Sequence, residues 1–228
     1  MAWTTAIAAH IGIETVHAAP GDGYLLVERF DRLIHGDPIQ PEGHVERLHQ
    51  EDICQALGFS GHTKYQVEGG PSLADAASLV RAISSQPAAD LLSLIRRHIA
   101  NILIGNADGH GKNLAMLYSK TGARLAPAYD LVCTRAYEGF TPMMAMATGT
   151  QHDPGQIDRR DFEEWAQSIG VSPRLILRSV EELLSEIAAA LPAVRDRFAH
   201  RWGDHAMLQR IDRIINTQLH RTRLLLVT

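Results

Sequence analysis

Apolar residues recur at helical intervals along much of the chain, and this pattern predicts a mainly helical protein. The clearest example is a helix expected from about Ala88 to Ile104 and ended by Gly105. Its apolar residues follow at intervals of 3, 4 and 3, as on a helix with one face in a core; they are Leu92, Ile95, Ile99 and Ile102. A second helix, begun by Ser172 and Pro173, carries a stripe of Ile176, Val180, Leu183 and Ile187.

Shorter elements complete the expected architecture. Further helices are expected over residues 4–11, 50–57, 72–84 and 161–169, and a last helix capped by Asp204 carries Leu208, Ile211 and Ile215. A strand is expected over 24–30, and a small hairpin joins 114–118 to 124–126. Residues 31–47 lack periodicity and are expected to form a loop, and 130–156 a long functional loop. The predicted fold class is mainly α (α+β).

Composition narrows the class of protein. The chain has 228 residues, 45% of them hydrophobic and 21% charged, which suits a folded domain and excludes wholesale disorder. No run approaches 18 uncharged apolar residues, so no membrane helix is expected, and the N-terminus does not resemble a signal peptide. A cytoplasmic location is therefore expected. Twelve histidines and a formal net charge of -4 argue against a general nucleic-acid binder.

A polar loop after the central helix concentrates the candidate chemistry. Residues 105–113 contain one Asp, one His, one Lys, two Asn and three Gly. Polar groups packed so densely need partners or a ligand if the loop lies against a core. The alternative is a solvated connector built from turn residues.

Two acidic residues and one amide in this region have the order of a phosphoryl-transfer site. Asp108 and Asn113 are five residues apart, the spacing of the catalytic Asp and metal-holding Asn in a protein-kinase catalytic loop. Asp130 follows the predicted hairpin, where a kinase-like fold has its second magnesium ligand. Carboxylate and amide oxygens are ligands suited to Mg²⁺.

Several motifs together resemble one family. The segment Asn106–Asn113 resembles the catalytic loop of HipA-type serine/threonine kinases, the toxins of bacterial toxin–antitoxin pairs. Further motifs follow in the family's order and cover most of residues 1–135: Val27–Arg32, Gln50–Asp52 with Cys54-Gln55, Lys64-Tyr65, Gly69–Ser72 and Ala128–Asp130. The resemblance implies a helical kinase-like C-lobe across 1–228, with a hinge region (1–35), a catalytic core (36–135) and a helical extension (136–228).

The resemblance also implies roles for individual residues and two cofactors, ATP and Mg²⁺. Asp108 would be the catalytic base, and Asn113 and Asp130 would hold Mg²⁺. The backbone of the hinge strand would bind adenine, with Asp31 near the ribose, although Phe30 taken by itself is typical of an ordinary core residue. The complete nucleotide-binding set implied is Glu28, Arg29, Phe30, Asp31, His110, Gly111, Lys112, Asn113 and Asp130.

The chain departs from the family pattern before the hinge. The first lysine is Lys64, after the predicted hinge strand, so the N-lobe with its phosphate-covering loop and strand lysine is expected to be missing. The expected partners are a protein substrate and an antitoxin or separate N-lobe chain, with nucleic acid reached only through an antitoxin. Two alternatives stay open: an inactive kinase-like module that binds an antitoxin or a kinase substrate, and a metal-dependent phosphodiesterase built on Asp108, His110 and Asp130.

Three other features carry weaker expectations. His98, beside Arg96 and Arg97, is expected on a helix surface. His44 and His49 match no metal-ligand spacing and are expected in a solvated loop. The arginine-rich end is expected to be a solvated helical face, with partner binding as the alternative; it comprises Arg210, Arg213, Arg221 and Arg223.

Overall fold

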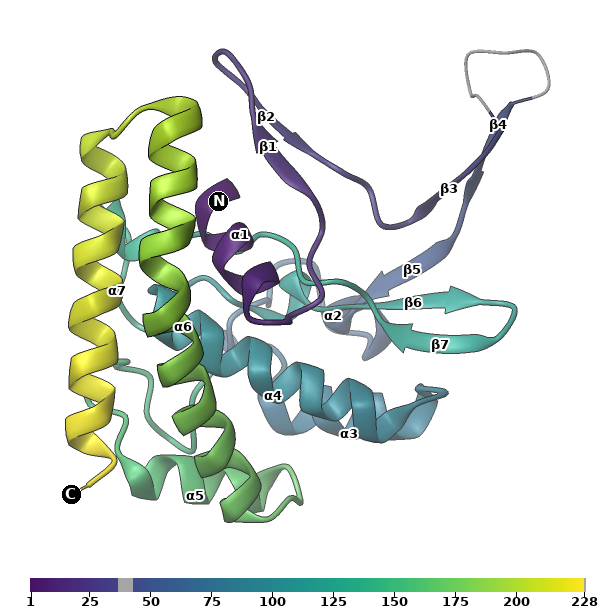
Figure 1. The fold of residues 1–228 in the computed structure, drawn as a ribbon. Coiled ribbons are helices and arrows are strands. Elements are labelled where there is room, and N and C mark those ends of the chain that lie inside the picture. The colour runs from purple at the N-terminus through teal and green to yellow at the C-terminus, as the bar shows by residue number, and fades with distance from the viewer. Residues whose placement is uncertain (37–42, 228) are drawn as a thin grey trace.

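The central element of the molecule is one buried helix. The structure is a computed structural model that describes residues 1–36 and 43–227. Helix α4 (Pro87–Ile104) contacts α3 (Leu73–Ile83), α6 (Pro173–Trp202) and α7 (Ala206–Leu225), as Figure 1 shows. A proline in the first turn starts α4, and Gly105 ends it in the left-handed conformation, with φ 75°.

The apolar stripe predicted for α4 is confirmed at three of its four positions. Ile95, Ile99 and Ile102 are buried, but Leu92 is 41% exposed. Successive residues on a helix are about 100° apart, and the buried face runs through Leu91 and Ile95, so Leu92 turns outward.

The helices together enclose a single apolar core. Helix α1 (Ala2–His10) lies against α6, and α5 (Arg159–Ser168) packs beside the first turns of α6 (Figure 1). The second predicted stripe is confirmed, because all four of its residues are buried. The predicted cap of the last helix is wrong: α7 begins after His205, and Asp204 lies one residue too early. Mainly helical architecture with small sheets is confirmed.

Two short hairpins and one three-stranded sheet make up the β-structure. β1 (Ala18–Pro20) pairs with β2 (Leu25–Val27), and β3 (Arg32–His35) pairs with β4 (His44–Arg47), both antiparallel. The third sheet has the order β5-β6-β7, built from β5 (His49–Asp52), β6 (Ala115–Ser119) and β7 (Gly122–Leu125). The predicted hairpin of β6 and β7 is confirmed, and the predicted strand over 24–30 is shortened to β2.

Two predictions between residues 31 and 57 are wrong. The expected loop contains β3 and β4, and its residues 37–42 lie outside the described residues. The expected helix over 50–57 is reduced to α2 (Ile53–Ala56), because the preceding residues form β5 by pairing with β6. Asp52 then caps α2 by accepting a hydrogen bond from the Gln55 N–H at 2.8 Å. Strand β5 has no apolar alternation, so only its distant partner makes it a strand.

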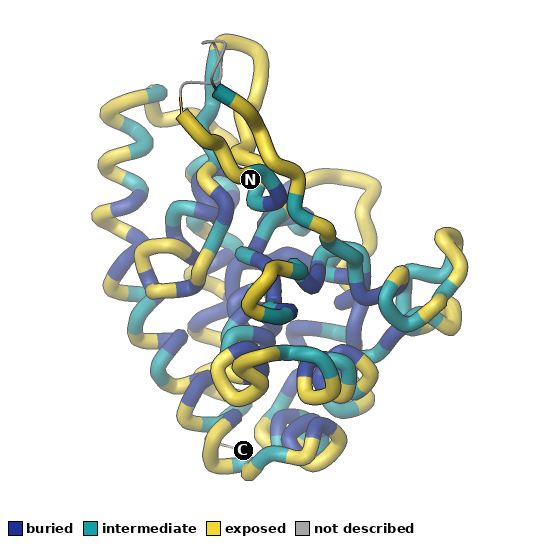
Figure 2. The backbone as a smooth tube through the Cα atoms, turned by 90° about the vertical axis from the view of Figure 1, so that its right-hand side faces the viewer, coloured by how far each residue is buried: buried dark blue, intermediate teal, exposed yellow. Residues whose placement is uncertain are grey.

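The two hairpins project away from the helical body. In Figure 2 the buried residues lie within the body, whereas the hairpins are mostly exposed. Their exposed apolar side chains include Tyr24, Leu26, Ile34 and Val45. No helix within residues 1–36 and 43–227 is both long and apolar enough to cross a membrane.

Candidate active site

The polar loop after α4 is packed against the protein and is not a solvated connector. Asn106 and Ala107 are buried. The Asn106 side-chain amide donates to Asn101 Oδ1 at 3.0 Å, and the Ala107 N–H donates to Thr134 Oγ1 at 2.9 Å. The loop is therefore held by α4 on one side and by the segment after β7 on the other.

Asp108 stands at the exposed side of this loop and is held by a tyrosine. The Tyr65 hydroxyl donates to Asp108 Oδ1 at 2.7 Å, while Oδ2 lies 3.9 Å from His110 Nε2. The His110 ring is buried against the edge of Tyr65, with ring centroids 5.4 Å apart. Burial lowers the pKa of His110, although the nearby Asp108 charge opposes that shift. A neutral His110 beside Asp108 leaves the carboxylate free to accept a proton.

Asn113 and Asp130 come together from two different loops. Asn113 ends a short 3₁₀ turn (Gly111–Asn113) and donates from Nδ2 to Asp130 Oδ2 at 2.8 Å. Its Oδ1 accepts the His110 N–H at 3.2 Å. Asp130 is the only non-glycine residue with positive φ, at 55°, among the described residues. Asp tolerates this left-handed conformation, which returns its carboxylate toward Asn113.

The Asn113 and Asp130 pair fits a magnesium ion by donor chemistry. Both residues offer hard oxygen donors, and Asp130 is exposed to solvent and to ligand. Mg²⁺ commonly takes one or two protein carboxylates and completes its shell with water and phosphate oxygens. By contrast, no group of three or more His, Cys, Asp and Glu within residues 1–36 and 43–227 is arranged to hold a metal.

The predicted hinge residues line a cavity with one residue of the polar loop. A cavity of about 420 Å³ is bordered by Glu28, Arg29, Phe30, Lys112 and Tyr129, among others. The Phe30 ring stacks on Tyr129 with centroids 5.3 Å apart, and the Tyr129 hydroxyl donates to the Lys112 carbonyl at 2.6 Å. Lys112 Nζ itself reaches the Gly61 carbonyl at 2.6 Å.

Asp31 is engaged within the hinge. Its buried carboxylate accepts two hydrogen bonds from Arg29, at 2.7 and 2.6 Å, and a third from Arg32. The hydrogen bond from Arg29 is the main cause that lowers the pKa of Asp31 to about 2. In this arrangement Asp31 stiffens the turn between β2 and β3. The Glu28 N–H donates a hydrogen bond to the His17 carbonyl at 2.9 Å.

A second pocket lies on the Asp108 side. Its volume is about 260 Å³, and its walls include Asp108, Asp130, Val132, Tyr137 and Phe140. The neighbouring residues Tyr129 and Asp130 thus border different cavities. Tyr129 borders the 420 Å³ cavity beside residues 28–30, called the hinge cavity below, and Asp130 borders this pocket.

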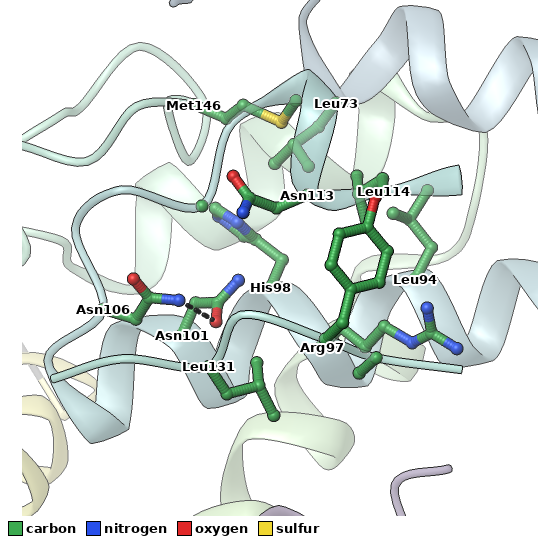
Figure 3. A pocket seen from close by; sticks show the side chains of 13 residues that line it. Leu73, Leu94, Arg97, His98, Asn101, Asn106, Asn113, Leu114, Leu131 and Met146 are labelled. Carbon is green, nitrogen blue, oxygen red and sulfur yellow. Dashed lines mark hydrogen bonds between the residues drawn. The ribbon is translucent and has the colours of Figure 1, made fainter. Parts of the chain in front are cut away.

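The expectation that His98 lies on a helix surface is wrong, because the side chain is buried and faces a small cavity behind the polar loop. Figure 3 shows His98, Asn101 and Asn106 facing this space, which measures about 20 Å³ and has room for about one water molecule. His98 is buried, with Nε2 2.9 Å from Thr148 Oγ1. Burial lowers the pKa of His98 to about 3. The sequence neighbours Arg96 and Arg97 suggested an exposed position for His98. The position is buried because α4 packs against other elements on several sides.

Sequence reasoning assigned no role to two aromatic residues that contact the site. Tyr65 and Tyr129 were noted only as parts of the Lys64-Tyr65 and Ala128–Asp130 motifs. The presence of a tyrosine in each of these two motifs was the only feature of the sequence that could have indicated these contacts. In the arginine-rich end, Arg213, Arg221 and Arg223 are exposed as expected. Arg210 is only half-buried, and its Nη1 lies 3.9 Å from Glu138 Oε1.

These features define a mainly helical fold with a buried polar loop, a contact between Asn113 and Asp130, and a cavity beside residues 28–30. The model of the HipA-like C-terminal domain matches residues 2–193, and the chain belongs to that family.

Curated relatives agree with this membership. The kinase-named protein Y4mE of Sinorhizobium fredii is 38% identical over 211 residues. The match covers 91% of this chain and 49% of Y4mE. The serine/threonine-protein kinase toxin HipA of Shewanella oneidensis is 32% identical over 180 residues, covering 75% of this chain and 41% of HipA. The chain thus spans about half or less of these relatives' length.

Solved structures agree as well. HipA in the Shewanella oneidensis complex with HipB and operator DNA superposes with a TM-score of 0.86 at 25% identity, covering 97% of this chain and 55% of that one. The Helicobacter pylori proinflammatory kinase CtkA gives a TM-score of 0.60 at 12% identity, covering 97% and 79%. The latter likeness concerns the fold alone.

Proposed function

We propose that this chain is the C-lobe of an ATP- and Mg²⁺-dependent serine/threonine protein kinase of the HipA type. The observation that carries the proposal is the meeting of three residues from two loops: Asp108 and Asp130 border one pocket, and Asp130 contacts Asn113 at 2.8 Å. Phosphoryl transfer needs a proton acceptor beside metal ligands in this way. Membership of a family with kinase-named relatives supports the same reaction.

In the proposed reaction Asp108 is the catalytic base. It aligns the acceptor hydroxyl of a Ser or Thr and takes its proton as the new O–P bond forms and the bond between the γ-phosphorus and the ADP oxygen breaks. Asn113 and Asp130 would hold Mg²⁺, which neutralises charge on the phosphates when bound. Lys112 and the backbone of Gly111 would lie along the phosphates, and His110 would position Asp108.

The hinge would hold the nucleotide's base. Arg29 and Phe30 join β2 to β3 at the rim of the hinge cavity, where their main-chain groups can face a planar base. Glu28 borders the same cavity, and Asp31 would keep the turn rigid through its two arginine partners. The division into hinge region (1–35), catalytic core (36–135) and helical extension (136–228) belongs to this proposal.

The partners follow from the share of the relatives that the chain spans. We infer that full activity needs an N-lobe, corresponding to the N-terminal half of the relatives, and that an antitoxin is the regulatory partner. The HipA neighbour is in complex with HipB and operator DNA, which supports an antitoxin and an indirect link to DNA. A protein substrate and a cytoplasmic location are parts of the same proposal.

An inactive binding module is the second candidate. It is favoured by exposed apolar side chains on the two hairpins, such as Leu26 and Ile34, which offer a surface to a partner. Such a module would keep the fold and bind a partner through the exposed hairpins without transferring phosphate.

Nucleotide titration and transfer assays test the proposal. Calorimetry with ATP should detect binding that depends on Mg²⁺ and is weaker than micromolar for the isolated chain, and Asp130→Ala should abolish the Mg²⁺-dependent part. Radiolabel transfer, measured with the N-terminal half of a relative supplied, should fall by about two to four orders of magnitude in Asp108→Asn, which keeps shape and removes the proton acceptor. ATP binding by Asp108→Asn should stay unchanged.

Transfer that survives Asp108→Asn would contradict the assigned base. An assembled complex that binds ATP and transfers no phosphate would favour the binding module. Arg159→Gln, in an exposed ion pair on α5, serves as the matched surface control and should change neither measurement.

A further inference from the structure

The pocket beside Asp108 has an apolar wall that the phosphoryl-transfer reaction does not itself require. Its lining includes the carboxylates Asp108 and Asp130 together with the apolar residues Val132, Tyr137 and Phe140. Tyr137 and Phe140 are 44% and 64% exposed and meet edge to face, with centroids 6.4 Å apart. Large aromatic side chains left in solvent beside a reactive group are typical of a recognition surface.

The rest of the segment reinforces this apolar character. Met143 is also exposed, so three large apolar side chains gather within residues 137–143. The segment is anchored at both ends: Thr134 Oγ1 accepts the Ala107 N–H at 2.9 Å, and the Ala145 N–H donates to the Ala107 carbonyl at 2.8 Å. Both anchors are in the loop that carries Asp108, which fixes the apolar wall relative to the carboxylate.

We propose that this wall is a specificity subsite, which takes an apolar side chain of the acceptor protein close in sequence to the phosphorylated Ser or Thr. The inference rests on the proposed function and names its substrate class: a flexible polypeptide segment with a hydroxyl residue beside an apolar residue. The occupant follows from continuity, because Asp108 is itself part of the pocket wall and anything that fills the pocket lies against it.

The size of the pocket limits the spacing. A compact space of about 260 Å³ is roughly 6 Å across, which matches about two residues of extended chain at ~3.3 Å each. The apolar residue should therefore lie within two positions of the acceptor hydroxyl.

Peptide binding to the 228-residue chain tests the subsite without needing transfer. Fluorescent peptides with one central Ser in a polar frame would carry Leu or Ser at each of the four flanking positions. We expect Leu at one position to lower Kd about tenfold relative to Ser. Phe140→Ser should reduce that ratio to less than threefold, and Phe140→Leu should retain it. Leu224→Ser, an equally apolar-to-polar change at an exposed site on α7, should leave the ratio unchanged.

A transfer assay with the same peptides and the N-terminal half of a relative supplied separates the two proposals. The position favoured in binding should show a higher kcat/KM, with the KM for ATP unchanged in Phe140→Ser. Transfer without any apolar preference, or a preference that survives Phe140→Ser, would overturn the subsite alone. Selective binding with no transfer in any arm would overturn the kinase proposal and leave a peptide-binding pocket. If Phe140→Ser instead weakens assembly of the two halves, the wall is an interface and the subsite is wrong.

Discussion

At the residue scale, the structure assigns Tyr65 a contact that the sequence motif did not reveal. Its hydroxyl donates to Oδ1 of Asp108, while Oδ2 lies 3.9 Å from His110 Nε2, and Asp108 borders the pocket that contains Tyr137 and Phe140. Burial, and after it the hydrogen bond to Asp108, raises the pKa of Tyr65. The hydroxyl therefore stays protonated and remains a donor through the physiological range. Tyr65 is a positioning residue in this interpretation.

Tyr65→Phe should lower kcat for phosphoryl transfer about tenfold in the assembled protein. A hydrogen bond to a charged group contributes about 1.5–3 kcal/mol, and part of that would be lost from the orientation of Asp108. The dissociation constant for ATP should not change, because Tyr65 does not border the hinge cavity.

Steady-state kinetics with separate kcat and KM values checks this expectation. Tyr118→Phe is the matched control, since its hydroxyl donates to Glu51 at 2.8 Å in the small sheet, away from Asp108. Equal losses in the two variants, or a loss confined to KM, would show that Tyr65 has no orienting role.

At the scale of elements, α4 links the core to both loops of the site. Asp90 near its start accepts hydrogen bonds from Arg124 and from the Leu125 N–H of β7, at 2.8 to 3.0 Å. Asn101 near its end holds Asn106, and His98 between them holds Thr148. A helix with polar contacts at three levels fixes the loops that carry Asp108 and Asp130.

The buried His98 makes stability depend on pH in a calculable direction. Its pKa in the folded chain is about 3, whereas in the unfolded chain the pKa of a histidine has its ordinary value of about 6.5. The stability that neutral His98 supports is therefore fully present above about pH 6.5. It is lost as pH falls toward 3, because protons then favour the unfolded state, by up to ~1.4 kcal/mol per pH unit.

Denaturant unfolding of the chain at several pH values between 7 and 4 measures this effect. His98→Gln, which carries no charge at any of these values, should show a shallower loss of unfolding free energy than the parent chain. His200→Gln on the exposed side of α6 should keep the parent's slope. Parallel curves for the parent and His98→Gln would refute the assignment.

At the scale of the whole molecule, the helical body is complete as a core while the hairpins are not covered. Buried apolar residues form one cluster from Trp3 in α1 to Leu219 in α7. Leu26 in β2 and Ile34 in β3, each 63% exposed, instead face solvent on the two hairpins. Apolar side chains exposed on short strands with free edges favour association.

The isolated chain should therefore self-associate through the hairpins. Sedimentation velocity should show a weight-average mass that rises with concentration, and the double variant Leu26→Ser/Ile34→Ser should bring it close to the monomer. Leu224→Ser/Val227→Ser, which replaces two exposed apolar residues near the C-terminus, should not. A parent chain that stays monomeric at all concentrations would contradict the prediction.

Local signals in the sequence were enough for the helices and for the order of the candidate site. Period, caps and a terminating glycine act within a few residues, so α4, most of α6 and the β6–β7 hairpin could be predicted. The spacing of Asp108 and Asn113 is local as well, and a family motif placed Asp130 beside them. The roles of these residues stay predictions until the variants are measured.

Long-range pairing decided what the sequence could not. Glu51 lies in a strand because it pairs with Met116, and Tyr65 reaches Asp108 across 43 residues. His98 is buried although its sequence neighbours are arginines, because α4 is surrounded by other elements. No window of a few residues contains such partners, because each of these contacts joins segments that are far apart in the sequence.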